Sequence, residues 1–516
     1  MNGAESLVHT LLKSGVTTCF ANPGTSEMHF VAALDRIPGM RCVLGLAETV
    51  VTGAADAYWR MAGVPAATLL HCGPGLANGL ANLHNARRSQ SGIVNIVGDQ
   101  ATYHRLLDPP LTSDTEGWAR GVSAWVRTAT SAATVGRDAA VAVQSARTPP
   151  GQIATLVLPA DTAWDEAGEV AYPLPVPQPV SATPFAVDTA ATALRRAASR
   201  GETVLIVLGG TALGEAALAN AHRIAQATGA RLIAQMSNAR IARGRGRVPV
   251  ERMPYPVDVA LAATAGVKHV VLAGGRRPMA FFAYPGKPGW LVPEDAEVTV
   301  LARPDEDAAD ALARLADTLG APKLAAPDPG PRPERATGRP VPEAVARTLA
   351  ATMPDNAIVV DESISFGRGF FANTIAAPPH DWLGLTGGAI GGGLPMAVGA
   401  ALGAPGRRVI NMQADGSAMY SISAFWTQAR ERLDVTTVIL SNRKYAILLG
   451  ELAAVGANPG RTALDMLDLG NPDLDFVRIA NGMGVEAARA ETCEQLADLM
   501  AASFARPGPF VIELAV

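Results

Sequence analysis

Several features that define whole classes of proteins are scarce in this sequence. Only four cysteines occur among 516 residues, and they are scattered rather than grouped at the spacing of metal ligands. This scarcity argues against a disulfide-stabilised secreted fold and against a cysteine-ligated metal centre. Charged residues make up 17 % of the chain, and the formal net charge is −4. Because there is no basic excess, nucleic-acid binding is not expected.

Long hydrophobic runs are also missing. Every apolar stretch is too short or too interrupted to cross a bilayer as a helix. The N-terminus begins with an amphipathic pattern and lacks the basic and apolar regions of a signal peptide. We therefore expect a cytoplasmic protein with reduced thiols and no membrane partner.

Proline is concentrated in two stretches, residues 165–185 and 321–342. Such density is incompatible with helix interiors and central strands, and it favours extended linkers. These linkers divide the chain into three expected domains, at residues 1–165, 186–320 and 343–516, each of ordinary domain size.

Each of these segments alternates short β-branched runs with alanine-rich helical patterns. This alternation is typical of parallel sheets covered by helices on both faces. The sequence therefore predicts an α/β protein with three tandem doubly wound parallel-sheet domains. The expected strands cover residues 17–20, 42–46, 67–70, 93–97, 155–158, 203–208, 231–234, 269–273, 298–302, 357–360, 408–412, 436–441 and 510–513.

The most informative motif is Asp415-Gly416-Ser417, which follows one apolar run, together with Asn442, which follows the next. A helical pattern lies between them, so both polar residues are expected at the carboxyl ends of parallel strands, where such sheets bind ligands. A carboxylate and an amide oxygen suit a hard cation, and Gly416 lets the backbone approach a phosphate closely. An Asp-Gly pair that stood alone would more often be only a turn.

This motif resembles the signature of thiamine diphosphate enzymes, in which an Asp-Gly begins and an Asn ends a segment of similar length. The usual double Asn is here Ser441-Asn442. The resemblance implies Mg²⁺ bound by Asp415, Asn442 and the main-chain carbonyl of Lys444, with Ser417 at the diphosphate. It covers the whole chain and implies, in order, a pyrimidine-binding, a central and a diphosphate-binding domain.

Glu48 lies among small and apolar neighbours at the start of a helical pattern. Carboxylates are rarely buried without a partner, and a buried carboxyl group suits proton exchange with a bound base. A helix-start Glu facing the helix dipole explains the pattern equally well. In thiamine diphosphate enzymes a Glu in this context protonates N1′ of the aminopyrimidine, and the resemblance gives Glu48 that role.

A glycine-rich run at residues 386–395 opens another helical pattern and allows a ligand to approach the backbone closely. It resembles the loop that contacts the aminopyrimidine in the same family. The resemblance implies that Ile390 holds the cofactor in its bent conformation and that the carbonyl of Gly388 accepts a hydrogen bond from the 4′-amino group.

Two further segments resemble benzoylformate decarboxylases. Residues 22–27 read as a turn with Thr25 or Ser26 as a helix N-cap, and the resemblance puts Thr25 where that group has an active-site serine, suited to holding the substrate carboxylate. His71 ends an expected strand on the ligand-binding side. A single His is more often structural, but imidazole transfers protons well near neutral pH, and the resemblance gives His71 that role.

The expected substrate pocket combines residues from distant parts of the chain. Ile447 and Leu448 follow the metal Asn and would form an apolar wall by the same resemblance, although ordinary helix core explains them equally well. Thr112 is expected to reach the site from a loop of the partner subunit.

The resemblance implies a thiamine diphosphate- and Mg²⁺-dependent 2-oxo acid decarboxylase that is similar to benzoylformate decarboxylase. The main alternative is an acetolactate synthase- or benzaldehyde lyase-like carboligase, because residues 279–284 lack the second histidine of benzoylformate decarboxylases. A non-catalytic thiamine diphosphate-binding paralogue is the third alternative. FAD is not expected and an NAD-linked dehydrogenase is disfavoured, since residues 207–212 lack a complete dinucleotide-binding pattern.

The expected partners follow from the same resemblance. They are a small 2-oxo acid or aldehyde and a second copy of the chain. The family arrangement implies a homodimer or homotetramer in which each cofactor is shared, with Glu48 from one subunit and Asp415 and Asn442 from the other.

Overall fold

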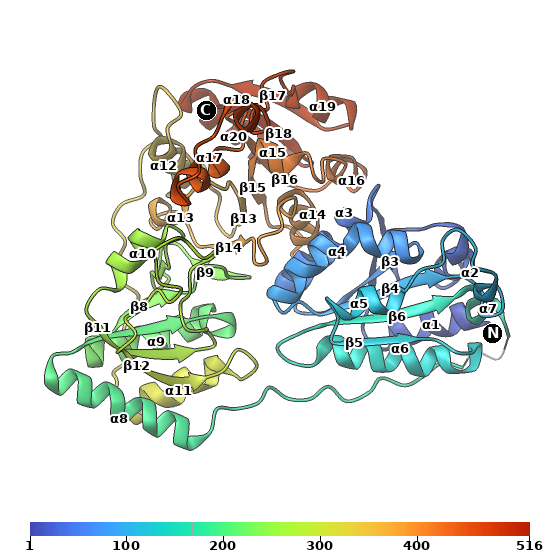
Figure 1. Cartoon of the computed structure of the whole chain (residues 1–516), viewed down its shortest axis with the longest axis horizontal. Helices are drawn as coiled ribbons and strands as arrows, with labels where there is room; N and C mark the ends of the chain where they lie inside the picture. Colours follow the sequence, from blue (N-terminus) through green and yellow to red (C-terminus); the bar gives the residue numbers. More distant parts are fainter. Residues whose placement is uncertain (167–168) are drawn as a thin grey trace.

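The computed structural model describes residues 1–166 and 169–516, and each of its three sheets lies in its own lobe (Figure 1). Residues 167–168 of the first expected linker lie outside the described residues. After them, the chain runs as an extended trace along the lower edge of Figure 1 to the middle lobe. No helix in the described part of the chain is both long and apolar enough to span a bilayer.

The N-terminal sheet has the strand order β2-β1-β3-β4-β6-β5, and all its pairs are parallel. Its inner strands consist mostly of aliphatic and β-branched residues and are buried on both faces, as a parallel sheet between helices requires. The strands are β1 (Thr18–Asn22), β2 (Arg41–Leu44), β3 (Ala66–Leu70), β4 (Ile93–Asp99), β5 (Trp125–Thr128) and β6 (Ile153–Pro159). The helices are α1 (Gly3–Lys13), η1 (Thr25–Glu27), α2 (Met28–Arg36), α3 (Glu48–Ala62), α4 (Cys72–Arg88), η2 (Arg105–Leu107), α5 (Thr115–Arg120), α6 (Ala132–Arg147) and α7 (Ala160–Trp164).

The middle sheet has the order β10-β8-β7-β11-β12 and is also parallel throughout. Its strands are β7 (Thr203–Leu208), β8 (Arg231–Ala234), β10 (Glu251–Arg252), β11 (Val267–Ala273) and β12 (Glu297–Ala302). Its helices are α8 (Pro184–Arg200), η3 (Gly210–Leu213), α9 (Glu215–Thr228), α10 (Val257–Thr264) and α11 (Ala308–Thr318).

The C-terminal sheet has the order β17-β18-β16-β15-β13-β14-β9. Its edge strand β9 (Ile241–Arg243) comes from the middle segment and pairs antiparallel with β14, whereas the other pairs are parallel. The remaining strands are β13 (Ile358–Glu362), β14 (His380–Gly384), β15 (Val409–Ala414), β16 (Val435–Ser441), β17 (Glu486–Ala490) and β18 (Phe510–Ala515). The helices are α12 (Pro342–Thr352), α13 (Phe370–Asn373), α14 (Gly393–Gly403), α15 (Asp415–Ala418), α16 (Ala424–Arg430), α17 (Ala446–Ala454), α18 (Arg461–Asp465), α19 (Phe476–Gly482) and α20 (Cys493–Phe504). The expected fold class is confirmed.

Helices α3 and α14 join the N-terminal and C-terminal lobes. Their backbones approach so closely that a Cβ atom at Gly399 would lie 1.9 Å from the carbonyl oxygen of Ala54. One hydrophobic core runs across this contact and includes Val50 and Ala54 from one side and Ala397 and Ala400 from the other. Close packing of this kind fixes the relative position of the two lobes.

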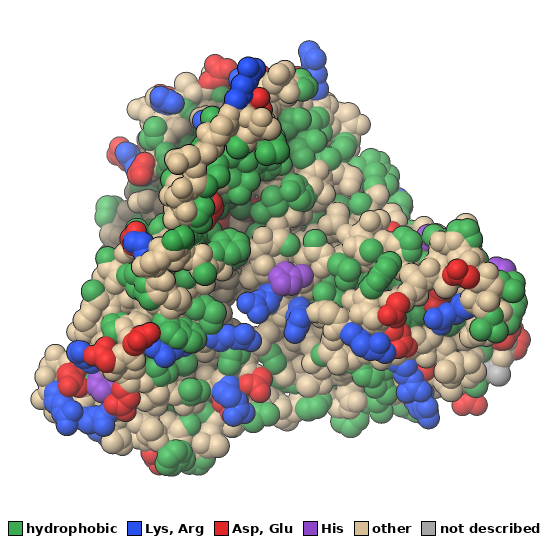
Figure 2. All heavy atoms as spheres, viewed as in Figure 1, with side chains coloured by type: hydrophobic (Ala, Val, Ile, Leu, Met, Phe, Trp, Pro, Cys, Tyr) green, Lys and Arg blue, Asp and Glu red, His purple; other side chains and the backbone are tan. Residues whose placement is uncertain are grey.

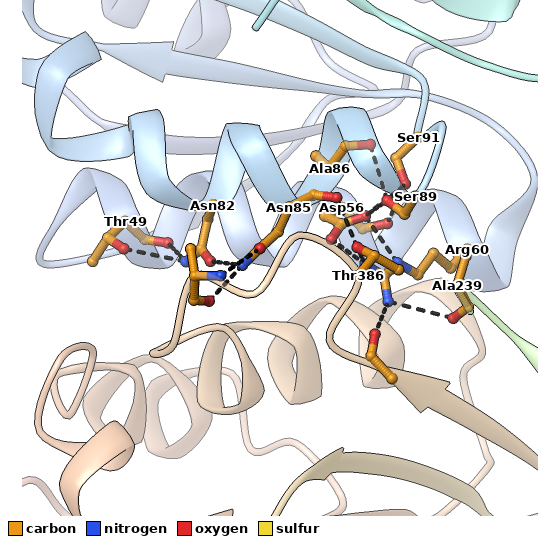
Figure 3. Close-up of polar contacts among 12 residues, drawn as sticks. Thr49, Asp56, Arg60, Asn82, Asn85, Ala86, Ser89, Ser91, Ala239 and Thr386 are labelled. Carbon is orange, nitrogen blue, oxygen red and sulfur yellow. Dashed lines mark hydrogen bonds and ion pairs between the residues drawn. The ribbon is translucent and has the colours of Figure 1, made fainter. Parts of the chain in front are cut away.

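A buried ion pair between Asp56 and Arg60 of α3 links the N-terminal lobe to the C-terminal lobe and to the segment that leads into β9 (Figure 3). Nη2 of Arg60 donates to Oδ2 of Asp56 at 2.5 Å, and both side chains are only 1 % exposed. Nη1 of Arg60 donates to the carbonyl oxygens of Gly384 in the C-terminal lobe, at 2.8 Å, and of Ala239 in the middle segment, at 3.3 Å. The remaining oxygen of Asp56 accepts from the hydroxyl of Ser89 at 2.7 Å.

Replacing Asp56 by alanine should destabilise the protein strongly, because it leaves the Arg60 guanidinium buried without its counter-charge. Removal of one partner of a buried ion pair costs about 3–5 kcal/mol. Urea unfolding followed by circular dichroism measures the change. The matched control is Glu116→Ala, which breaks the exposed pair between Glu116 and Arg120 in α5 and should cost less than about 1 kcal/mol. Equal unfolding midpoints for the two variants would contradict the role given to Asp56.

Candidate active site

Asp415 and Asn442 leave neighbouring strands at the same edge of the C-terminal sheet. Ala414 of β15 pairs with Leu440 of β16, and the two polar residues follow directly. Asp415 is buried, and its carboxylate accepts from the backbone N–H groups of Gly416, at 2.8 Å, and of Arg443, at 2.6 Å. Burial raises the pKa of Asp415, while these backbone donors oppose the rise. The sequence motif is therefore one compact site.

The donor set of this site fits a hard cation. Within the described residues, Asp415 has no Lys or Arg ion-pair partner, so its buried carboxylate lacks the counter-charge that such groups normally have. Asn442 and Lys444 line a pocket of about 430 Å³ beside it. A Cβ atom at Gly416 would lie 2.4 Å from the ring of Tyr445, so a larger residue there would require this ring to move. The oxygens of Asp415, Asn442 and the Lys444 carbonyl are the ligand types that Mg²⁺ prefers.

Ser417 points into the protein rather than into this pocket. Its hydroxyl donates to the carbonyl of Ala414 at 3.1 Å and accepts from Nε2 of Gln413 at 2.7 Å. A contact between Ser417 and a diphosphate is thus left to its backbone N–H, which lies in the first turn of α15.

Glu362, at the end of β13, is a site residue that sequence reasoning missed. Its buried carboxylate accepts from the backbone N–H groups of Gly391 and Gly393, both at 2.7 Å, and from Nε2 of Gln413 at 2.9 Å. Burial raises its pKa, and these three donors oppose the rise. Glu362 therefore joins the glycine-rich loop to the network beneath the Asp-Gly-Ser turn. The available signal was the acidic pair Asp361-Glu362, which ends a strand that begins with three aliphatic residues.

The glycine-rich loop carries Gly388 and Ile390 on one short segment. Gly388 has φ +80°, a conformation that strains other residues, and a Cβ atom there would lie 2.7 Å from the ring of Phe281. Ile390 is half-buried and stands between Ala389 and Gly391, whose backbone groups are both hydrogen-bonded by side chains. The loop expected to contact a cofactor is therefore held in a defined shape.

Glu48 is the first residue of α3 and is 7 % exposed. Its Oε2 accepts from Nδ2 of Asn78 at 3.1 Å, and a Cβ atom at Gly75 would lie 2.8 Å from its Oε1. The helix-start position and the burial expected from the sequence are both present. Within the described residues of this one chain, Glu48 shares no hydrogen bond with Asp415 or Asn442.

Thr25 and His71 line a second pocket, of about 470 Å³, at the carboxyl edge of the N-terminal sheet. Nδ1 of His71 lies 3.0 Å from Oε2 of Glu27 and 3.4 Å from the hydroxyl of Ser26. Glu27 is 1 % exposed. The structure thus brings together the two residues that were expected to bind and protonate a substrate, and it adds a buried carboxylate behind the imidazole.

The N-cap expected at Thr25 or Ser26 is wrong. Gly24 is the N-cap of η1, and its N–H donates to Oε2 of Glu27 at 2.8 Å. Glu27 is therefore used twice, at the turn and at His71. Its role was missed because the sequence does not reveal that these two segments lie side by side.

The remaining expected pocket residues lie outside this second pocket. Ile447 is half-buried and Leu448 is exposed on α17. Thr112 lies between η2 and α5; its neighbour Leu111 lines the pocket with Thr25 and His71. A single chain therefore does not assemble all the residues that the sequence suggested.

The middle lobe presents aromatic side chains rather than a second histidine beside the loop. The hydroxyls of Tyr255 and Tyr284 donate to the two carboxylate oxygens of Glu451 in α17, at 3.0 and 2.9 Å. Burial, followed by the bond to Glu451, raises the pKa of Tyr284. The rings of Tyr255 and Phe281 lie 5.5 Å apart. Tyr284 is thus committed to α17 and is a poor proton donor.

A buried carboxylate and an amide at the edge of one sheet, a glycine-rich loop of the same lobe and a buried Glu at the start of a helix in another lobe are a combination that suits a cofactor with a diphosphate group. Two family models match the chain: "Thiamine pyrophosphate enzyme, N-terminal TPP binding domain" over residues 1–118 and "Thiamine pyrophosphate enzyme, C-terminal TPP binding domain" over residues 370–514. The chain belongs to the thiamine pyrophosphate enzyme family, whose cofactor is thiamine diphosphate.

Several relatives within this family are similar to the chain along its whole length. The chain is 53 % identical to a Mycobacterium tuberculosis protein whose provisional name is acetolactate synthase large subunit IlvX, covering 100 % of this chain and 99 % of that protein. It is 30 % identical to benzoylformate decarboxylase of Pseudomonas aeruginosa, over 98 % of this chain and 97 % of that one. Among solved structures, the thiamine diphosphate-dependent 4-hydroxybenzoylformate decarboxylase of Rhodococcus jostii RHA1 superposes with a TM-score of 0.86 at 25 % identity, covering 99 % and 98 % of the two chains.

Proposed function

We propose that this chain is a thiamine diphosphate- and Mg²⁺-dependent decarboxylase of 2-oxo acids, of the benzoylformate type. The observation that carries the proposal is the pair of His71 and buried Glu27 beside Thr25 in a pocket of about 470 Å³. The similarity to benzoylformate decarboxylase along nearly the whole chain supports it.

The residues proposed to bind the cofactor come from the C-terminal and N-terminal lobes. When bound, thiamine diphosphate supplies the carbon nucleophile and the electron sink that decarboxylation of a 2-oxo acid needs. Asp415, Asn442 and the Lys444 carbonyl would hold Mg²⁺ at the diphosphate. The carbonyl of Gly388 would accept from the 4′-amino group, and Ile390 would support the bent conformation. Glu48 would exchange a proton with N1′ of the aminopyrimidine.

The substrate residues lie in the N-terminal lobe. The hydroxyl of Thr25 would hold the substrate carboxylate. Because Nδ1 of His71 faces Glu27, Nε2 is the nitrogen that would deliver a proton to the product. A carboxylate behind an imidazole fixes which of its two nitrogens faces the substrate.

Product analysis tests the reaction type. The protein is incubated with thiamine diphosphate, Mg²⁺ and a series of donors from pyruvate to benzoylformate, and CO₂ and organic products are measured together. Release of CO₂ with an equal amount of free aldehyde, fastest for aromatic donors, is the expected result. Bound cofactor without turnover of any donor would favour the non-catalytic alternative.

Carboligation is the second candidate, and the aromatic residues of the middle lobe favour it. The ring of Phe281 packs against Gly388, and the hydroxyl of Tyr284 donates to Glu451. Aromatic side chains thus take the place of a histidine among residues 279–284. If proton delivery is slow, a second carbonyl compound can react instead, as the name of the Mycobacterium tuberculosis relative would suggest. An acyloin or acetohydroxy acid appearing with the CO₂ would identify this activity.

Two copies of the chain would share each cofactor in this proposal. Glu48 and Asp415 lie in different lobes and share no hydrogen bond within the described residues. The C-terminal lobe exposes hydrophobic side chains, including Met419, Tyr420 and Leu448, and Figure 2 shows a broad hydrophobic area on this lobe above a hollow between the lobes. Exposed apolar areas of this kind are typical of subunit interfaces.

Replacing His71 by alanine should lower kcat/KM for the best donor by roughly 10²–10⁴-fold, the usual contribution of a general acid or base. Thiamine diphosphate affinity should be unchanged, since His71 lies in the substrate pocket. Steady-state kinetics and a cofactor titration measure the two effects. His222→Ala, a buried histidine of α9 in the middle lobe, is the matched control and should keep full activity. Wild-type kinetics in the His71 variant would refute the assignment.

A further inference from the structure

Asn85, near the end of α4, hydrogen-bonds the backbone of the glycine-rich loop with both ends of its side-chain amide (Figure 3). Its Nδ2 donates to the carbonyl oxygen of Ala389 at 2.8 Å, and its Oδ1 accepts from the N–H of the same residue at 3.2 Å. Asn85 is 1 % exposed. One side chain therefore satisfies both backbone groups of the residue between Gly388 and Ile390.

A second asparagine extends this contact toward Glu48. Nδ2 of Asn85 also donates to Oδ1 of Asn82 at 3.1 Å. Nδ2 of Asn82 in turn donates to the carbonyl oxygen of Thr49, at 2.8 Å, and to its hydroxyl, at 3.1 Å. Asn82 and Asn85 are three positions apart on α4 and so share one face of the helix. We call Thr49, Asn82, Asn85 and Ala389 the asparagine link.

The opposite side of the loop is held by Glu362. It accepts from the N–H groups of Gly391 and Gly393, immediately after Ile390. Gly388 is exposed, and glycine adopts φ values of either sign readily, so its φ of +80° must be held by the residues on either side of it. The contact of Asn85 with Ala389 therefore helps to fix where the carbonyl of Gly388 and the side chain of Ile390 lie, together with Glu362 on the far side and His84, whose Nε2 lies 3.0 Å from the carbonyl oxygen of Gly387.

We propose that Asn85, supported by Asn82, is a positioning residue for the cofactor: it sets the Gly388–Ile390 segment and ties it to the start of the helix that carries Glu48. This inference rests on the proposed function, because it gives the loop its role at the aminopyrimidine. Both buried amide side chains are fully hydrogen-bonded within the link, as buried polar groups require.

Cofactor binding without substrate tests the link. Apoprotein is titrated with thiamine diphosphate in the presence of Mg²⁺ for the wild type, Asn85→Ala and Asn85→Asp. The Kd of Asn85→Ala should rise about tenfold, equivalent to ~1.4 kcal/mol. Asn85→Asp keeps the size of the side chain and the acceptor for the Ala389 N–H but places a carboxylate against the Ala389 carbonyl. Its Kd should rise at least as much. If an Asn85 variant fails to fold, Asn82→Ala, which removes only the support of Asn85, should raise the Kd in the same direction by a smaller factor.

A second readout separates positioning from simple loss of stability. At saturating cofactor, deuterium exchange at C2 of the thiazolium, followed by NMR, should be slower in both Asn85 variants, because the 4′-amino group is less well placed. The matched control is Asn95→Ala in β4. Asn95 is fully buried and bonds Thr68 and Thr155 of the neighbouring strands, so its loss should lower the unfolding temperature without changing Kd or exchange.

The outcomes are distinguishable. A wild-type protein that does not bind thiamine diphosphate refutes the proposed function and this inference with it. A wild type that binds the cofactor, with an unchanged Kd and exchange rate in both Asn85 variants, refutes the asparagine link alone. Equal losses in Asn85→Ala and Asn95→Ala would also overturn it, because a general loss of stability would then explain both.

Discussion

Replacing Glu48 by glutamine should leave thiamine diphosphate bound but lower kcat by roughly 10²–10⁴-fold, the range for loss of a general acid or base. Glutamine keeps the shape of the side chain and can still contact Asn78, the present hydrogen-bond partner. It cannot exchange a proton with N1′, so the cofactor would not be activated. Cofactor titration and donor turnover, measured on the same preparation, separate binding from activation.

The control for this variant is a second helix-start glutamate. Glu343 lies in the first turn of α12 and is exposed, so Glu343→Gln should behave as the wild type. If Glu48→Gln retained full turnover, the proton-exchange role would have to be abandoned. If it lost the cofactor instead, Glu48 would be a binding residue.

Replacing Asp415 by alanine should abolish the Mg²⁺-dependent retention of the cofactor. Loss of groups that merely support a metal ligand weakens metal binding roughly 10–100-fold, so loss of a ligand itself should weaken it by more than about 100-fold. The buried carboxylate has no cation among its partners in the described residues, so Mg²⁺ is what its charge would attract. Equilibrium dialysis with thiamine diphosphate, with and without Mg²⁺, measures the effect.

The exposed Asp498 of α20 is the matched control. Asp498→Ala should bind Mg²⁺ and cofactor normally. Cofactor affinity that is equal in the wild type and Asp415→Ala, and insensitive to a chelator in both, would show that Asp415 is not a metal ligand.

The two inactive variants together test the shared site. In a hybrid dimer of a Glu48→Gln chain and an Asp415→Ala chain, one site carries both lesions and the other carries none. Mixing the variants under conditions that allow subunit exchange should therefore restore activity to about a quarter of the wild-type value. Failure to restore any activity, despite exchange, would place Glu48 and Asp415 of one chain at the same cofactor.

The sequence predicted the elements with strong local signals. The runs at 203–208 and 231–234 are strands with those bounds, because β-branched and aliphatic residues favour a buried parallel sheet. β17, with the sequence Glu-Ala-Ala-Arg-Ala, has no such signal and exists because it pairs with β18. β9 escaped notice for a related reason, since it leaves the middle segment to join a sheet formed more than a hundred residues later. The helix expected between Asp415 and Asn442 is divided into α15 and α16, with serines at 421 and 423 that compete for backbone hydrogen bonds.

In the candidate site, too, residues in local sequence patterns were predicted, and residues that act through distant contacts were not. Asp415, Asn442, Gly388 and Ile390 could be proposed from the sequence because each stands in a recognisable local pattern. Asn85, Glu362 and Glu27 could not, because each acts through a contact with a segment far away in the sequence. Such contacts depend on how separate segments pack, within a lobe for Glu362 and Glu27 and between lobes for Asn85, and local patterns do not encode this packing.

The most direct test of the account is CO₂ release from benzoylformate by protein that has first been freed of cofactor and metal. Adding thiamine diphosphate and Mg²⁺ together should restore release, and either one alone should not. CO₂ release without either addition would contradict the proposed dependence on thiamine diphosphate and Mg²⁺. If the cofactor is demonstrably bound but no CO₂ is released from benzoylformate or any other 2-oxo acid, the proposal that this family member is a decarboxylase is contradicted.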